Sequence, residues 1–342
     1  MPIGLIGAGG IGRMHVERAL RSPDVAITAI ADPTESARAF AASVNIPCYA
    51  SHAEMLGNAK VNAVIVATPN NLHVAQGLDC IARGLVTLIE KPIADNVADA
   101  RRLCDAAIAA NVPLLTGHHR RHNPIIRRAK QLVADGVLGR PVTANAMATW
   151  LKPDSYYGLA WRREPGGGPV MINLIHDIDL LRHLLGDISR VQAITSNNVR
   201  GFAVEDTAAV LLQFANGALG TVTLSDTAAA PWNWDLAAGE AAHYPRQEID
   251  SHYLTGTEGA LTLPRLEIWR YRGARGWHDP LSMERTFVHH ADPYHEQLRH
   301  LRAVAEGREV PLCSGVDGLK TLAATRAVLE AAAQGKAVAP AA

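Results

Sequence analysis

The chain has 342 residues, of which 48% are hydrophobic and 19% are charged, and its 33 basic residues balance its 33 acidic ones. This length suits a large core and two domains, and the zero net charge argues against a nucleic-acid partner or an anionic membrane surface. No run approaches the ~18 apolar residues of a membrane span, and we expect no secretory signal. Four scattered cysteines are typical of reduced thiols in a cytoplasmic protein.

Short apolar runs alternate with helix-like segments up to about residue 117. The runs cover residues 3–6, 26–31, 63–67, 85–89 and 113–116, and helical spacing covers residues 11–21, 34–43, 72–83 and 97–110. Continuous apolar runs are typical of strands that are covered on both faces of a parallel sheet. Their alternation with helices predicts a doubly wound α/β sheet of the Rossmann type over residues 1–120.

Longer strands follow after residue 120. Helical segments cover residues 124–135, 170–185, 293–306 and 318–333, and strand-like segments cover residues 142–150, 191–199, 207–214, 218–225, 248–255 and 260–272. The pair Asn216-Gly217 predicts a hairpin between two of these strands. We therefore expect residues 121–342 to form an α+β domain on a large, mainly antiparallel open sheet.

A glycine-rich turn, GAGGIG at residues 7–12, follows the first strand and opens the first helix. In such a turn Gly7 permits the bend, Gly9 lets the backbone approach a pyrophosphate, and Gly12 lets helix and strand pack closely. The N–H groups of the helix N-terminus favour phosphate. The cofactor contacts predicted from this turn are Gly7, Gly9, Gly10, Ile11 and Gly12.

Asp32 ends the second predicted strand, 20 residues after Gly12. A carboxylate at this place accepts hydrogen bonds from the adenosine ribose hydroxyls and repels a 2′-phosphate. It favours NAD over NADP. Arg38 lies one helical turn further on and could reach back to a phosphate, so NADP stays the less favoured alternative.

Lys91 lies in Glu90-Lys91-Pro92, directly after the apolar run 85–89, and the chain has only six lysines. Ligands of open α/β sheets bind beyond the carboxyl ends of the strands. A lysine can lose its proton when it is partly desolvated, whereas an arginine cannot. Lys91 is therefore a candidate catalytic group, and the alternative is a surface lysine.

A second candidate is His176, on the helix predicted after three glycines and Pro169. The glycines predict a mobile loop. Asn173, His176 and Asp179 share one broad helix face, and histidine exchanges protons near neutral pH. The alternative is a capping or core histidine held by Asp179.

Together these motifs resemble the glucose–fructose oxidoreductase / inositol dehydrogenase / MocA (Gfo/Idh/MocA) family along nearly the whole chain. The matching segments are residues 7–12, 67–70, 73, 90–92, 120–124, 161–162, 166–179, 292–300 and 314–319. The resemblance implies a dinucleotide domain followed by an α/β domain whose open sheet makes homodimers or homotetramers.

The resemblance also implies roles for single residues. Lys91 matches the family's catalytic lysine, and His176 matches its acid/base histidine. Further cofactor contacts are then expected at Thr68, Asn70, His73, Glu90, Lys91, Trp161 and Arg162. Many members carry Asp four residues before the histidine, where this chain has Ile172. The substrate contacts of the inositol dehydrogenases are therefore not transferred to this chain.

The expected reaction is hydride transfer between the nicotinamide of NAD and a secondary alcohol of a sugar, cyclitol or related polyol. Candidate substrate contacts are His119, Arg121, Tyr156, Asn173, Trp232 and Trp234. Two alternatives are an NAD-dependent glycosidase that oxidises its substrate transiently and a non-catalytic NAD-responsive binding protein. A metal enzyme is a third, but no carboxylate or cysteine completes a ligand set around the clustered histidines, so no metal is expected.

Overall fold

The computed structural model describes residues 1–241 and 243–342, which divide into two compact units. Unit 1 comprises Met1–His122, Ala291–Leu322 and Ala342, and unit 2 comprises Asn123–His290 and Ala323–Ala341. The sequence pattern predicts one boundary near residue 120, with all later residues in the second domain. In the structure the chain returns to unit 1 after residue 290, because helix α9 (Pro293–Ala305) supplies apolar side chains to the core of that unit.

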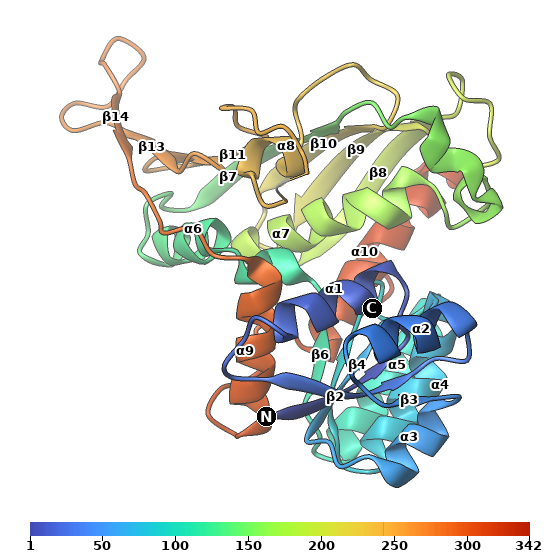
Figure 1. The fold of residues 1–342 in the computed structure, drawn as a ribbon. Coiled ribbons are helices and arrows are strands. Elements are labelled where there is room, and N and C mark those ends of the chain that lie inside the picture. Colours follow the sequence, from blue (N-terminus) through green and yellow to red (C-terminus); the bar gives the residue numbers. More distant parts are fainter. Residues whose placement is uncertain (242) are drawn as a thin grey trace. The chain divides into compact units, whose positions relative to one another are not determined.

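Unit 1 is built on a six-stranded parallel sheet with the strand order β3-β2-β1-β4-β5-β6 (Figure 1). Its strands are β1 (Pro2–Ile6), β2 (Ala26–Ala31), β3 (Cys48–Tyr49), β4 (Ala63–Val66), β5 (Val86–Ile89) and β6 (Leu114–Thr116). Its helices are α1 (Gly10–Ala19), α2 (Glu35–Ser43), α3 (His52–Asn58), α4 (Asn70–Ile81), α5 (Val97–Ala109), the 3-10 helix η1 (His119–His122) and α9. The strand order reverses between β1 and β4, which is where open α/β sheets bind their ligands.

The core of unit 1 joins elements from both ends of the chain. Leu5 of β1, Val16 of α1 and Leu298 of α9 belong to one buried apolar cluster. Helices α4 and α5 also pack closely, since a Cβ at Gly77 would lie 2.9 Å from the Leu103 side chain. Helix α9 therefore contributes to the same core as β1 and α1.

The elements β3 and α3 are the part of unit 1 that the sequence pattern does not predict. A strand of two residues shows no alternation of apolar and polar side chains. Helix α3 has seven residues and buries only Met55, so its apolar periodicity is weak. Its visible local signal is the cap, in which the Ser51 side chain accepts the Glu54 N–H.

Unit 2 is built on an eight-stranded sheet with the order β14-β13-β12-β11-β7-β10-β9-β8. Among the described residues, β7 and β10 pair in parallel and the other neighbouring strands pair antiparallel. Its strands are β7 (Pro141–Thr149), β8 (Ile188–Ser196), β9 (Thr207–Phe214), β10 (Leu219–Ser225), β11 (His252–Gly256), β12 (Ala260–Leu263), β13 (Glu267–Arg270) and β14 (Ser282–Arg285). Its helices are α6 (Pro124–Ala134), η2 (Asp154–Gly158), η3 (Ala160–Arg163), the π-helical η4 (Val170–Leu174), α7 (Ile175–Leu185) and α8 (Trp234–Ala238). Helix α10 (Gly315–Gln334) begins in unit 1 and ends in unit 2. The predicted hairpin joins β9 and β10, with Gly217 at a φ of 90°.

Helices α6, α7 and α10 lie on one face of the unit 2 sheet (Figure 1). Val210 and Val222 point into the core beneath these helices. The residues that alternate with them point the other way, and Ile194, Leu211 and Leu219 are exposed apolar side chains on that face. The structure therefore has the predicted fold class, a parallel Rossmann sheet and a mainly antiparallel open sheet.

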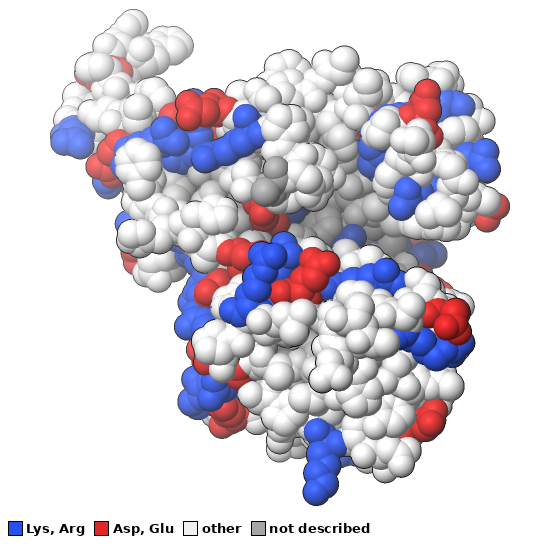
Figure 2. Space-filling view, viewed as in Figure 1, with Lys and Arg blue, Asp and Glu red and all other residues white. Residues whose placement is uncertain are grey.

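Charges of both signs are mixed on the surface. On the face that Figure 2 shows, Lys and Arg lie among Asp and Glu on each unit. In the described residues, none of the helices combines the length and the apolar character that crossing a bilayer requires.

Candidate active site

The glycine turn after β1 has the backbone geometry that its sequence predicts. Gly7 has a φ of 92°, and a Cβ there would lie 2.7 Å from the Ala67 carbonyl oxygen. A Cβ at Gly12 would lie 2.0 Å from the Gly7 carbonyl oxygen. Only glycine fits these two positions, because a side chain would separate helix α1 from the turn.

The N-terminal end of α1 is open at the two middle glycines of the turn. A Cβ at Gly9 or Gly10 would meet no atom within 4 Å. Gly9 caps the helix without a side-chain hydrogen bond, and the first turn holds no acidic residue. The first N–H groups of α1 and the open space before them fit the pyrophosphate of a dinucleotide.

Asp32, directly after β2, braces the same turn. Its carboxylate accepts the Ala8 N–H at 2.9 Å, and it accepts the N–H and the hydroxyl of Thr34 at 2.9 and 2.7 Å. Burial alone would raise the pKa of Asp32, but these hydrogen bonds and the charge of Arg13 hold it below its ordinary value. Asp32 is therefore a charged acceptor at the end of β2.

Arg38, the cation that could neutralise a 2′-phosphate, is engaged elsewhere. It pairs with Glu35 at 2.9 Å and donates to the Pro33 carbonyl at 2.9 Å. These contacts support the preference for NAD that Asp32 predicts.

His73 ties together the loops that follow β4 and β5. Its Nε2 lies 2.8 Å from the Thr68 carbonyl oxygen, and its Nδ1 lies 2.9 Å from the Pro92 carbonyl oxygen. The side chain is fully buried, and burial holds the pKa of His73 below its ordinary value. His73 thus holds together the loop after β4, which contains Thr68, and the loop after β5, which contains Lys91. Asn70 is the first residue of α4.

Glu90 is a buried carboxylate beside Lys91. His15 of α1 lies 2.8 Å from it, and the Lys91 N–H donates to it at 3.2 Å. Burial would raise the pKa of Glu90, but the His15 hydrogen bond and charge, followed by His119 and Lys91, hold it below its ordinary value. Gly117 leaves room for this group, since a Cβ there would lie 2.8 Å from the carboxylate.

Two further rings pack around this pair. His119 stacks on Tyr294 of α9 with 4.3 Å between the ring centres, and His15 meets the same tyrosine edge-on at 5.7 Å. Unit 1 therefore brings together His15, Glu90, His119 and Tyr294. The sequence motifs single out Glu90 and His119 but not His15, whose signal is a lone histidine one turn after the glycine motif.

In unit 2, His176 lies in the second position of α7 and is 8% exposed. A short π-helical turn, Val170–Leu174, precedes it. The preceding glycines serve close packing, because a Cβ at Gly167 would lie 2.0 Å from the Trp161 carbonyl oxygen. A Cβ at Gly168 would lie 2.3 Å from the Glu205 carboxylate, which accepts the Val170 N–H at 2.9 Å. The sequence predicts that these glycines make the loop mobile. In the structure, Gly167 and Gly168 instead allow close packing.

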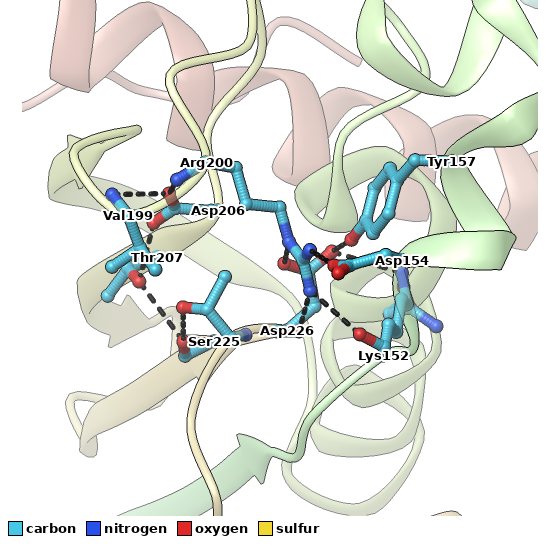
Figure 3. A network of polar contacts seen from close by, with 11 residues as sticks. Lys152, Asp154, Tyr157, Val199, Arg200, Asp206, Thr207, Ser225 and Asp226 are labelled. Atoms are coloured by element: carbon cyan, nitrogen blue, oxygen red, sulfur yellow. Dashed lines mark hydrogen bonds and ion pairs between the residues drawn. The ribbon is translucent and has the colours of Figure 1, made fainter.

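A buried polar network lies at the carboxyl ends of the parallel strands β7 and β10 (Figure 3). Asp226, 1% exposed, accepts the Tyr157 hydroxyl at 2.5 Å and lies 3.3 Å from the Lys152 ammonium. Arg200 donates to the carbonyl oxygens of Lys152 and Asp226 at 2.8 and 3.0 Å. Burial, with the Asp226 carboxylate, raises the pKa of Tyr157, so this hydroxyl stays a donor.

Comparison with known proteins identifies the family. Residues 1–118 match the family described as "Oxidoreductase family, NAD-binding Rossmann fold", and residues 126–262 match the "GFO/IDH/MocA C-terminal domain". The 1,5-anhydro-D-fructose reductase of Ensifer adhaerens is 30% identical over 337 residues, which cover 98% of this chain and 97% of the relative. The chain belongs to the Gfo/Idh/MocA oxidoreductase family.

A second relative and a solved structure are also similar to this chain. The myo-inositol 2-dehydrogenase of Thermotoga maritima is 27% identical over 94% of this chain and 93% of its own length. The WlbA dehydrogenase of Bordetella pertussis, crystallised with NADH and UDP-GlcNAcA, shares the fold, with a TM-score of 0.80 at 24% identity over 98% of both chains. Unit 1 of this family member thus contains its NAD-binding Rossmann fold.

The other predicted contacts lie in varied surroundings. Arg121 is buried in unit 1, where it donates to the Leu312 carbonyl at 3.1 Å. In unit 2, Trp161 and Trp232 are partly exposed. Trp234 is 1% exposed and belongs to the unit 2 core, where its indole N–H donates to Glu240 at 2.8 Å.

Tyr156 and Arg162, both predicted contacts, lie together in unit 2. The Arg162 guanidinium is 3.8 Å from the Tyr156 ring centre and donates to its carbonyl at 2.6 Å. The Lys152 ammonium lies 4.6 Å from the same ring centre. Lys152 is the residue that sequence reasoning missed here, and its only signal is the rarity of lysine in this chain.

Proposed function

We propose that the chain catalyses hydride transfer between NAD and a secondary alcohol of a sugar, cyclitol or related polyol. The observation that carries the proposal is the place of Lys91. Lys91 follows β5. The glycine turn follows β1 and Thr68 follows β4, and because these strands are parallel, all three lie at the same edge of the sheet. The buried Glu90–His15 pair lies beside it. Relatives named as a 1,5-anhydro-D-fructose reductase and a myo-inositol 2-dehydrogenase favour a substrate of this class.

In this proposal two side chains handle the reacting hydroxyl. When NAD is bound, its nicotinamide accepts or returns the hydride. The Lys91 Nζ donates a hydrogen bond to the reacting oxygen and stabilises the alkoxide that develops. The His176 imidazole takes the hydroxyl proton during oxidation and returns it during reduction.

The test is NADH formation across a panel of sugars and polyols, with the variants Lys91→Met and His176→Ala. Each substitution should lower kcat about 10²- to 10⁴-fold, the usual contribution of a positioned proton-transfer group, while NAD binding persists. Lys60→Met, at an exposed lysine, is the matched control. Unchanged turnover in Lys91→Met, or release of sugar from a glycoside without net NADH, would contradict the proposal.

We also propose that the chain forms a homodimer or homotetramer through the open face of the unit 2 sheet. Ile194, Leu211 and Leu219 give this face apolar surface that assembly would bury. Light scattering should show a multiple of the monomer mass, and Leu211→Asp should lower it. A wild-type monomer at micromolar concentration contradicts this.

A reducing compartment such as the cytoplasm suits the four free cysteines. Burial raises the pKa of Cys80 to about 12 and that of Cys104 to about 11, so their thiolates are scarce. We expect a thiol reagent to label these two only after unfolding.

A further inference from the structure

Lys152 is held at the junction of two parallel strands in unit 2. Its N–H donates to the Asp226 carbonyl at 2.9 Å, just beyond the ends of β7 and β10. Its side chain is buried among the polar groups of Figure 3 and is 7% exposed. The other five lysines, all in the described part of the chain, are partly or fully exposed. A buried lysine in this chain therefore requires an explanation in terms of its partners.

The Lys152 ammonium has two polar partners. It donates to the Asn173 side-chain oxygen at 2.7 Å and lies 3.3 Å from the Asp226 carboxylate. An ammonium carries only donors, so the amide atom that faces it has to be the oxygen. The Asn173 NH₂ group consequently points away from Lys152.

Asn173 lies three residues before His176, in the π-helical turn that leads into α7. Its side chain is partly exposed. Within the described residues, the bond from Lys152 is the only side-chain hydrogen bond of Asn173, so its NH₂ group has no protein acceptor. Ile172, next to it, adds no charge. The π-helical turn thus presents an uncommitted pair of N–H donors three residues before the proposed acid/base residue.

The surroundings of this donor pair favour negative charge. Lys152 and Arg162 flank the Tyr156 ring at 4.6 and 3.8 Å, and Arg162 forms no ion pair with a described residue. The carboxylates near Lys152 are Asp226, which Lys152 and Tyr157 share, and Glu205, whose pKa burial holds above its ordinary value. Burial holds the pKa of Lys152 below its ordinary value despite Asp226, so a further anion nearby would favour its charged form.

We propose that Lys152 is a positioning residue that turns the Asn173 amide so that its NH₂ group donates to the substrate. These two residues of unit 2 then select a sugar acid as the substrate. The substrate is then a polyol that carries a carboxylate near the carbinol that reacts. A carboxylate only accepts hydrogen bonds, so it matches an N–H donor pair better than a hydroxyl does. This inference rests on the proposed function and narrows its substrate class.

The main test is Asn173→Asp, which keeps the shape and the bond from Lys152 but replaces the donor pair with a negative charge. The probes are D-glucuronate against D-glucose and D-galacturonate against D-galactose. Their dissociation constants for the NADH complex are read from NADH fluorescence, and their kcat/KM values are measured with NAD. In the wild type an acid should bind about tenfold or more tightly than its neutral partner, as a charge-assisted hydrogen bond predicts.

In Asn173→Asp this preference should disappear, because two carboxylates then face each other, while the neutral sugar binds nearly as before. Asn216→Asp is the matched control. It adds the same charge at an exposed residue of unit 2, in the turn between β9 and β10, whose side-chain oxygen accepts the Ala218 N–H. Equal loss of preference in both variants would show a general charge effect and overturn the proposal.

The role of Lys152 is tested by the ratio of kcat/KM for a sugar acid to kcat/KM for its neutral sugar. A purely structural role of Lys152 would leave this ratio unchanged. Lys152→Met should lower this ratio because the amide can then rotate, and Lys152→Arg should retain it. If Lys152→Met does not fold because Asp226 loses its partner, Lys152→Arg and Asn173→Asp still decide the matter.

The two proposals fail differently. Lys91-dependent oxidation of neutral sugars without preference for an acid, or binding of neither acid to the NADH complex, overturns the sugar-acid inference alone. Absence of any Lys91-dependent NADH formation overturns the proposed function as well.

Discussion

The glycine turn of unit 1 and the Lys152–Asp226 network of unit 2 lie in comparable places, beyond the carboxyl ends of strands, but they are built from different materials. The turn consists of backbone groups from adjacent residues, and glycine fits it because a Cβ at position 12 would lie 2.0 Å from a carbonyl oxygen. The network consists of polar and charged side chains, such as Tyr157 and Asp226, which are 69 residues apart.

This difference predicts different sensitivities. A backbone turn is sensitive to the addition of one carbon atom and has no net charge to lose. A buried network tolerates no loss of charge, because each remaining ion would stay in a poorly solvating interior. Substitutions that add volume in unit 1 or remove charge in unit 2 therefore test this difference.

The largest effect is expected for Asp226→Ala. Removing this buried carboxylate leaves Lys152 and Arg200 without the negative charge that they share. Breaking a buried pair costs about 3–5 kcal/mol of unfolding free energy. Asp154→Ala is the control, since its fully exposed carboxylate meets the same Arg200 at 3.2 Å. Urea denaturation measures both. Equal, small changes would show that burial of Asp226 does not matter.

Gly12→Ala should come next. The new methyl would collide with the Gly7 carbonyl oxygen, and overpacking of this kind costs about 1–3 kcal/mol. Thermal unfolding should show the loss, and NAD binding should weaken strongly because the turn has to open. Retention of wild-type stability and affinity together would mean that the close approach of Gly12 is not needed.

Gly9→Ala separates binding from folding. Its methyl meets no protein atom within 4 Å, so thermal stability should hold, while NAD affinity should fall about tenfold if the backbone approaches the pyrophosphate. Gly57→Ala, equally open but on α3, should change neither property beyond a small helix-propensity effect. Unchanged NAD affinity in Gly9→Ala would place the cofactor elsewhere.

The smallest effect concerns pH and the buried pair of unit 1. Because the fold lowers the pKa of Glu90, its contribution to stability is complete above the ordinary value of 4.5 and is lost as the pH falls through the lower native value. His15→Gln removes a positive charge, so the native pKa should rise and acid unfolding should begin at a higher pH.

The control for this shift is His52→Gln, at an exposed histidine 2.8 Å from Asp79. Acid titrations followed by circular dichroism compare the three proteins. A midpoint that stays at the wild-type pH in His15→Gln would mean that His15 does not stabilise the Glu90 carboxylate.

Much of unit 1 could be predicted because its signals are local. The glycine turn and Asp32 lie in one strand-turn-helix-strand segment, and four-residue apolar strands such as β4 are continuous runs. β3 and α3 are too short for periodicity, and α9 joins the unit through Leu298, which no local pattern reveals.

The candidate site shows the same division. Glu90, Lys91 and His176 stand in recognisable motifs. His15 and Lys152 do not, since the first meets Glu90 across 75 residues and the second meets Asn173 across 21. The sequence predicts Trp232 and Trp234 as substrate contacts alike, but the fold buries the Trp234 indole and exposes that of Trp232.

The fold class, the dinucleotide turn and the family are predictable from the sequence alone, because each depends on residue types at short, regular spacing. The place of α9 in unit 1 and the contact between the Lys152 ammonium and the Asn173 side chain become visible only in the folded chain. A buried ion is stable only beside a partner, and Lys152 and Asp226 become partners because the fold pairs the strands β7 and β10 that precede them. No spacing along the chain specifies that meeting.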